Sequence, residues 1–134
     1  MEDIVQILYQ KALEVRLNAY APYSQYKVGA AVYTANKNIY TGCNVENISF
    51  PCGTCAEAGA IAAMVAGGDK TIKNMLIVSE GKNLVYPCGA CLQRIAEFVN
   101  ENTIIYLANT QKICEKHLLK ELLPYNFKEE GIGK

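Results

Sequence analysis

The apolar run in Asn74–Ser79 (NMLIVS) constrains the fold of this chain more than any other segment. A run without alternating polar residues is typical of a central strand whose two faces are both buried. Predicted helices lie before and after it in the chain, at about residues 3–19, 55–65 and 88–100. Because helices must cover both faces of such a strand, the sequence predicts a layered α/β domain.

Other segments complete the predicted sheet. Lys27–Ala35 and Ile39–Val45 are β-prone and rich in small residues, and the polar turn Asn36-Lys37-Asn38 between them suits a hairpin. Further strands are predicted at Thr103–Ala108 and near Ile113–Lys116, followed by a short helix over Leu118–Leu123 that ends at Pro124. We therefore expect a three-layer α/β/α fold with a mixed five-stranded sheet, formed by one domain over residues 1–134.

The charge balance limits the classes of ligand. Thirteen basic residues balance thirteen acidic ones, and no cluster of Lys and Arg marks a face. Because polyanion binding needs a basic surface, nucleic acid is excluded as a partner and a small, nearly neutral ligand is expected. The acidic start Met1-Glu2-Asp3 does not resemble a secretory signal, and no run approaches the ~18 apolar residues of a membrane span. We expect a cytoplasmic protein that does not bind membranes.

Clustered cysteines form the motif that carries chemistry. In a reducing compartment such cysteines are more often metal ligands or catalytic residues than disulfides. Cys55 begins one predicted helix, and Cys88 and Cys91 lie on one face of the first turn of another. Three sulfur atoms can therefore converge on one ion, and helix N-termini stabilise thiolates. Thiolate ligands make zinc the expected metal.

Glu57 follows Cys55 by two residues. Three protein ligands leave one position of a tetrahedral zinc ion for water, and zinc lowers the pKa of that water to about 7. A carboxylate beside the water can take its proton and pass it on, so Glu57 is predicted to be a proton shuttle and not a ligand. Three thiolates with such a glutamate are the signature of zinc-dependent nucleobase deaminases.

The same cysteines allow other interpretations. Cys52 and Cys55 form a second Cys-x-x-Cys pair, so Cys52 can be the fourth ligand of a closed structural zinc site or the partner of Cys55 in a redox pair. Glu57 favours the catalytic site, and a domain of this size does not need a metal for stability. The remaining candidates are assigned structural roles: buried free thiols for Cys43 and Cys114, and a surface or packing role for His117.

An ordered series of segments resembles the small, homotetrameric type of cytidine deaminase and covers most of the chain. Besides Cys-Ala-Glu and Pro-Cys-Gly-Ala-Cys, the series consists of Ala21–Ser24, Val28–Ala31, Gly42–Asn47 and Glu121–Pro124. The resemblance implies that Asn44 and Glu46 bind the ribose hydroxyls, and an amide with a carboxylate can satisfy a sugar diol. For Asn44 the structural alternative is a turn-forming residue at a strand end.

The resemblance also implies how the rest of the pocket is built. Tyr26, where phenylalanine is usual, packs near the sugar or base, and Ala56 contributes backbone contacts to the pyrimidine. Phe50 and Phe127 match positions where an aromatic residue from a neighbouring subunit closes a pocket. A homotetramer with shared active sites and one zinc ion per chain is therefore expected.

Two positions depart from the pattern of that family. Ala58 and Leu92 stand where the family usually has arginines, one of which contacts the thiolates and partly neutralises them. With less positive charge nearby, a three-thiolate zinc site is a weaker Lewis acid. We predict that Arg94 or a neighbouring subunit compensates in part, or that activity peaks at higher pH.

The resemblance implies the hydrolysis of cytidine and deoxycytidine to uridine and deoxyuridine with release of ammonia, a reaction of pyrimidine salvage. Glu57 would move a proton from water to ring N3 and then protonate the departing amine. Two alternatives remain open. One is a deaminase of a related aminonucleoside such as blasticidin S, and the other is a non-enzymatic module with a structural zinc ion that needs Cys52.

Overall fold

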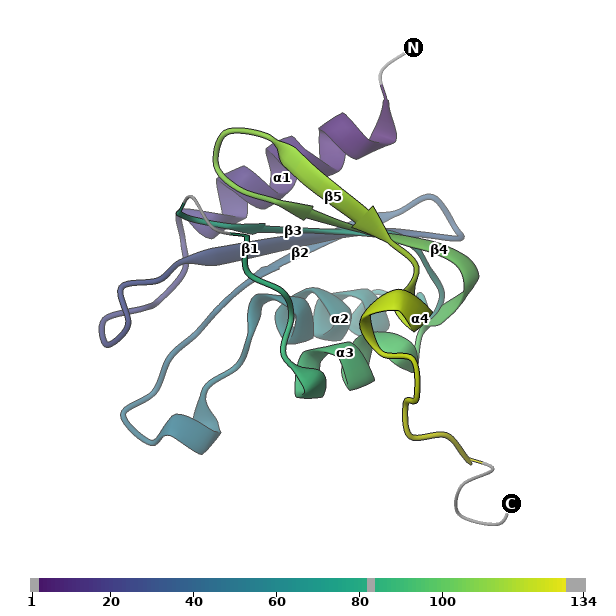
Figure 1. Ribbon diagram of the computed structural model, residues 1–134. Helices are drawn as coiled ribbons and strands as arrows, with labels where there is room; N and C mark the ends of the chain where they lie inside the picture. Colours follow the sequence, from purple (N-terminus) through teal and green to yellow (C-terminus); the bar gives the residue numbers. More distant parts are fainter. Residues whose placement is uncertain (1–2, 82–83, 130–134) are drawn as a thin grey trace.

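A mixed five-stranded sheet forms the centre of the molecule in the computed structural model, which describes residues 3–81 and 84–129. The strands lie in the order β2-β1-β3-β4-β5 (Figure 1). Only β3 and β4 are parallel to each other, and the other neighbouring pairs are antiparallel. The strands are β1 (Val28–Thr34), β2 (Ile39–Cys43), β3 (Ile72–Ser79), β4 (Val99–Ala108) and β5 (Ile113–His117).

Helices cover both faces of the sheet, as Figure 1 shows. The helix α1 (Ile4–Arg16) lies on one face, and it begins where the Asp3 side chain accepts a hydrogen bond of 3.0 Å from the backbone N–H of Val5. The other face carries α2 (Ala56–Ala66), α3 (Gly89–Ala96) and the short α4 (Leu119–Leu122). The predicted three-layer α/β/α fold with a mixed five-stranded sheet is confirmed.

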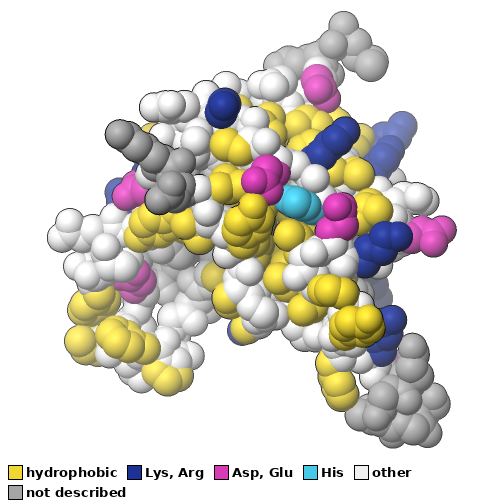
Figure 2. Space-filling model, in the orientation of Figure 1, with side chains coloured by type: hydrophobic (Ala, Val, Ile, Leu, Met, Phe, Trp, Pro, Cys, Tyr) yellow, Lys and Arg dark blue, Asp and Glu magenta, His cyan; other side chains and the backbone are white. Residues whose placement is uncertain are grey.

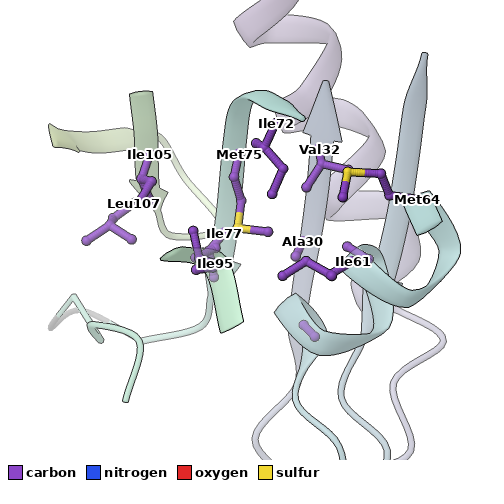
Figure 3. Packing of buried hydrophobic residues seen from close by; sticks show 12 residues of the cluster. Ala30, Val32, Ile61, Met64, Ile72, Met75, Ile77, Ile95, Ile105 and Leu107 are labelled. Carbon is purple, nitrogen blue, oxygen red and sulfur yellow. The ribbon is translucent and has the colours of Figure 1, made fainter. Parts of the chain in front are cut away.

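The central strand β3 contains the apolar run, and its residues alternate between the two faces. Met75 and Ile77 pack in a cluster with side chains from α2 and α3, which Figure 3 shows pointing toward one another. Leu76 and Val78 pack in a second cluster with Leu8 and other residues of α1. Both faces of β3 are therefore buried, as the absence of alternating polarity predicts.

The boundary between α3 and β4 differs from the sequence expectation. The helix predicted over 88–100 ends at Ala96, because the backbone N–H of Phe98 bonds to Ile95 and the chain then joins the sheet. Ile72 donates its N–H to the Phe98 carbonyl at 2.8 Å and pairs with Val99, which starts β4. Apolar residues at 98–99 suit a helix or a strand, and sheet pairing decides between them.

Gly42 lets α2 lie directly on β2. A Cβ atom at this position would lie 2.3 Å from the Ala60 nitrogen and 2.5 Å from the Ala56 carbonyl oxygen. Both atoms belong to the backbone of α2, so only glycine permits this approach. The contact fixes the distance between the sheet and the first turns of α2.

In the described part of the chain, no helix is long and apolar enough to cross a membrane.

Candidate metal centre and substrate pocket

Three of the predicted site residues meet at the N-termini of α2 and α3. Cys55 is the N-cap of α2, Glu57 lies in the first turn of that helix, and Cys91 lies in the first turn of α3. Their two sulfur atoms and one carboxylate oxygen all lie within 4.8 Å of one another. Glu57 and Cys91 are buried, with 5% and 3% of their surface exposed. This spacing and the sulfur donors fit a zinc ion.

The two thiols are coupled by a hydrogen bond. The Cys91 S–H donates to the sulfur of Cys55, and this bond lowers the pKa of Cys55 to about 6 and raises the pKa of Cys91. A hydrogen bond from the Ala58 backbone and the positive charge of Arg94 also lower the pKa of Cys55. Cys55 is therefore a thiolate near neutral pH, which is the form that binds metals.

Burial raises the pKa of Glu57 to about 7, and the negative charge of Cys55 contributes in the same direction. A carboxyl group with this pKa takes up and releases a proton near neutral pH. General acid and base catalysis works best when the pKa of the group lies close to the working pH. The structure therefore gives Glu57 the protonation behaviour that a proton shuttle needs.

Arg94 is a cation beside the thiols. Its Nη1 atom lies 4.0 Å from the Cys91 sulfur, from the next turn of α3. The two positions where the family usually has arginine carry no charge here, since they hold the half-buried Ala58 and the buried Leu92. The described residues thus place one positive charge at the metal centre from a position further along the helix.

Cys88 and Cys52 lie outside the group that meets within 4.8 Å. Cys88 is the N-cap of α3 with an extended backbone (φ −72°, ψ 168°), and its side chain is exposed. Cys52 is exposed in the short 3-10 helix η1 (Phe50–Cys52), and its sulfur lies 3.6 Å from the Ser49 hydroxyl. The structure therefore brings together two of the three predicted ligands, and Cys88 stays a prediction.

A pocket of about 450 Å³ opens beside Cys55. This volume lies in the range of small-molecule sites. Hydrophobic side chains gather over the projecting loop that carries η1 (Figure 2), and Phe50, on this wall of the pocket, is 79% exposed. The pocket is lined by Tyr23, Ser24, Asn44, Val45, Glu46, Asn47, Phe50, Gly53, Thr54 and Cys55.

Asn44 and Glu46 line this pocket, and their side chains also form hydrogen bonds with the backbone of neighbouring segments. The Asn44 side chain accepts a bond of 2.8 Å from the Val28 N–H and donates one of 2.8 Å to the Tyr26 carbonyl. An amide nitrogen has two hydrogens, so the second can face a ligand. These bonds reach residues 16 and 18 positions earlier in the chain, so the side chain of Asn44 ties two segments together and does not form a local turn.

The Glu46 carboxylate accepts bonds from the backbone N–H groups of Tyr23 and Ser24, at 3.0 and 3.1 Å, and from the Ser24 hydroxyl. The bond from the Ser24 hydroxyl is the main reason that the pKa of Glu46 is lowered. Tyr23 and Ser24 also line the pocket, although the sequence analysis assigned no role to either of them. Their signal was the segment Ala21–Ser24, which carries the family resemblance without showing what it contacts.

The remaining predicted residues lie at different distances from this pocket. Ala56 is fully buried at the start of α2, next to Cys55. Tyr26 is half-buried, lies outside the pocket lining and donates its hydroxyl to the Glu80 carbonyl at 2.8 Å. Phe127 is 65% exposed and exchanges hydrogen bonds of 3.0 and 3.1 Å with the Gln93 side chain, away from the pocket of its own chain.

Comparison with known proteins gives a consistent result. Residues 3–107 match the family described as cytidine and deoxycytidylate deaminase zinc-binding region. The cytidine deaminase of Sporosarcina psychrophila is 38% identical over 129 residues, which cover 96% of this chain and 95% of that protein. The cytidine deaminase of Halalkalibacterium halodurans is 36% identical over 128 residues, with coverage of 96% and 97%.

Solved structures agree with these matches. The crystal structure of cytidine deaminase from Burkholderia pseudomallei superposes with a TM-score of 0.86 at 35% identity, covering 91% of this chain and 98% of that one. The fold and the match to the zinc-binding region thus point to the same group of proteins as the cysteine and glutamate motifs. This chain belongs to the cytidine and deoxycytidylate deaminase family.

Proposed function

We propose that this protein catalyses the hydrolytic deamination of cytidine and deoxycytidine to uridine and deoxyuridine with release of ammonia. The observation that carries the proposal is the buried Glu57 within 4.8 Å of the Cys55 and Cys91 sulfur atoms, where Cys55 also lines the pocket of Asn44 and Glu46. Relatives that cover nearly the whole chain are named cytidine deaminases, which supports this substrate class.

Cys55, Cys88 and Cys91 are proposed to hold one zinc ion per chain. Two of these sulfur atoms already lie together, and Cys88 starts the same helix as Cys91, three residues before it. When bound, zinc supplies Lewis acidity, which lowers the pKa of a coordinated water molecule toward about 7. The Arg94 guanidinium, 4.0 Å from the Cys91 sulfur, offsets part of the negative charge of the thiolates.

Glu57 is the proposed acid and base. Its carboxylate takes a proton from the attacking water and delivers it to ring N3, so the C4–N3 double bond becomes a single bond as the C4–O bond forms. The Glu57 carboxylate next removes the proton of the new hydroxyl group on C4. The protonated Glu57 then gives that proton to the amino group. The bond between C4 and the amino nitrogen then breaks as the C4=O double bond forms, and ammonia leaves. A carboxyl with a pKa of about 7 can accept and donate within one cycle near neutral pH.

The pocket residues orient the nucleoside. Asn44 offers its second amide hydrogen to a ribose hydroxyl, while Glu46 fixes the loop of Tyr23 and Ser24 and presents its carboxylate to the sugar. Ala56 contributes backbone groups to the pyrimidine from the start of α2, and Tyr26 braces the wall behind the sugar.

The exposed aromatic residues suggest that the pocket is completed by a second chain. Phe50 and Phe127 are 79% and 65% exposed, and Phe127 lies outside the pocket of its own chain. Contiguous exposed apolar side chains are typical of interfaces, and Ile48, two residues before Phe50, is 75% exposed. We infer a homotetramer with shared active sites, acting in the cytoplasm in pyrimidine salvage.

One assay separates this function from its alternatives. The ultraviolet absorbance of cytidine, deoxycytidine, CMP and blasticidin S is followed with the purified protein, and zinc is measured per chain. We expect turnover of the two nucleosides, little turnover of CMP, and one zinc ion per chain. Preferential turnover of blasticidin S would assign an aminonucleoside deaminase, and bound zinc without any turnover would assign a structural module.

Glu57→Gln tests the role of the carboxylate. The variant should keep zinc and lose at least about 100-fold in kcat, because general acid and base catalysis contributes on that scale. Glu14→Gln, at an exposed position on α1, is the matched control and should keep the parent activity. Substantial turnover by zinc-loaded Glu57→Gln would refute the assignment.

A further inference from the structure

A cluster of three side chains contacts the chain segment between Glu80 and Cys88, at the end close to Cys88. The Tyr86 hydroxyl lies 2.9 Å from both carboxylate oxygens of Glu115 on β5, to which it donates. The His117 Nε2 atom lies 2.7 Å from Oε1 of the same carboxylate. The rings of Tyr86 and His117 are also in edge contact, with centroids 6.2 Å apart and planes at 60°. We call these three residues the Tyr86 cluster.

The hydrogen bonds of the Tyr86 cluster are the main contacts that hold residues 84–87 in place. Among hydrogen bonds between described residues, the Tyr86 hydroxyl makes the only ones that involve residues 84–87. Leu84 adds an apolar contact, since it packs against the cluster of buried residues under the sheet. The hydroxyl bonds are charge-assisted, and such bonds are stronger than those between neutral groups.

Pro87 makes the link from Tyr86 to Cys88 rigid. A proline ring fixes its own φ near −65°, and it restricts the preceding residue to extended conformations. Tyr86 and Cys88 are two residues apart, so their Cα atoms are separated by about 7 Å of chain with few torsional degrees of freedom. The position of the tyrosine ring therefore restricts where the α3 N-cap, with the exposed Cys88 side chain, can lie.

The other end of the segment is anchored separately. Glu80 forms an ion pair with Arg16 of α1, and its carbonyl accepts the Tyr26 hydroxyl at 2.8 Å. The Tyr86 cluster is thus the anchor on the α3 side, where the third predicted ligand is attached.

We propose that Tyr86, Glu115 and His117 are positioning residues that place Cys88 for metal binding through the Tyr86–Pro87–Cys88 link. This role rests on the proposed function, in which Cys88 is a zinc ligand. Glu115 and His117 belong to β5, so the edge strand of the sheet takes part in assembling a metal site built from two helices. Residues that hydrogen-bond a metal ligand directly typically change metal affinity by 10- to 100-fold when they are mutated, and a cluster that acts one link further away is expected at the low end of that range.

The test is zinc affinity, measured on the full-length protein by competition with a chromogenic chelator. Tyr86→Phe and Glu115→Ala should each weaken zinc binding by about tenfold. The double variant should lose little more than either single one, because both changes break the same bond. Glu115→Gln keeps an acceptor oxygen and should recover most of the affinity. Tyr9→Phe is the control, since it removes a hydroxyl that donates to the Asn109 carbonyl at 2.9 Å on the α1 side.

A second readout follows the ligand itself. Cobalt-substituted Tyr86→Phe should show weaker thiolate-to-metal charge-transfer absorption than the parent, since one thiolate is held less well. Parent-like zinc affinity and cobalt spectra for folded Tyr86→Phe would overturn the positioning role while leaving the metal site standing. A parent protein that binds no zinc would instead overturn the metal site itself, and the positioning role with it.

Discussion

Gly42→Ala is the substitution that most directly separates the packing of α2 from the chemistry at its first turn. The new Cβ atom would lie 2.3 Å from the Ala60 nitrogen and 2.5 Å from the Ala56 carbonyl oxygen. Ordinary contacts of this kind begin at 3.4 Å, so α2 must move away from β2 by about 1 Å. Overpacking of this kind typically costs about 1–3 kcal/mol of unfolding free energy.

The displaced helix carries part of the metal centre. Cys55 and Glu57 move with the start of α2, whereas Cys91 stays with α3. Metal and catalytic sites tolerate errors of only about 0.5 Å, so a 1 Å shift should weaken zinc binding by roughly tenfold or more and lower kcat. The measurements are urea unfolding, chelator competition and the rate of cytidine hydrolysis.

Gly29→Ala is the matched control on the opposite face. Its Cβ atom would lie 2.2 Å from the Ala12 carbonyl oxygen and 2.9 Å from the Arg16 Cβ, so it displaces α1. We expect a similar loss of unfolding free energy with zinc affinity close to that of the parent. The reasoning is refuted if Gly42→Ala keeps parent zinc affinity despite the lost stability, or if both variants lose zinc affinity equally.

Three further outcomes follow from the site. Arg94→Ala should weaken zinc binding by about fivefold and move the rising limb of the pH–rate profile to higher pH. The reason is that a solvent-exposed charge 4.0 Å from the Cys91 sulfur contributes on the order of 1 kcal/mol. An unchanged affinity and profile would exclude its compensating role. Cys52→Ser should keep one zinc ion per chain by elemental analysis, whereas loss of zinc would favour a four-cysteine structural site. In zinc-stripped protein, Glu57→Gln should gain stability over the parent as pH rises from 4.5 to about 7, since the raised pKa of Glu57 makes folding less favourable once the group ionises. The difference in unfolding free energy between variant and parent, measured by denaturation, should be larger at pH 8 than at pH 5 by up to about 3 kcal/mol.

The layers of the fold were predictable because the pattern of β3 is unambiguous. Met75–Val78 contains no polar residue, which requires covered faces, and the structure buries alternate residues against α1 and against α2 and α3. The end of α3 was not predictable in the same way. Phe98 and Val99 are apolar and suit either element, and their state depends on a strand, β3, that is distant in sequence.

In the candidate site too, contacts within one motif were predictable and contacts between distant segments were not. Spacing within one helix start brought Cys55 and Glu57 together, and the motif containing Cys91 completed the group. Spacing did not predict that the Cys88 side chain is exposed and outside this group, whereas Cys55, an N-cap with a similar extended backbone, lies within it. The path of the loop before each helix therefore decides where the cap side chain lies. The bond between Tyr86 and Glu115 joins a loop to an edge strand, and no local pattern in the sequence encodes such a pair.

The placement of Cys55 before β3 and of Cys91 after it has a thermodynamic consequence. An ion held by both sulfur atoms closes a loop that contains the whole central strand, so it binds the native chain and not the unfolded one. Each tenfold rise in free zinc above the dissociation constant then adds about 1.4 kcal/mol to the free energy of unfolding. The melting temperature of this protein should therefore rise with the zinc concentration around it.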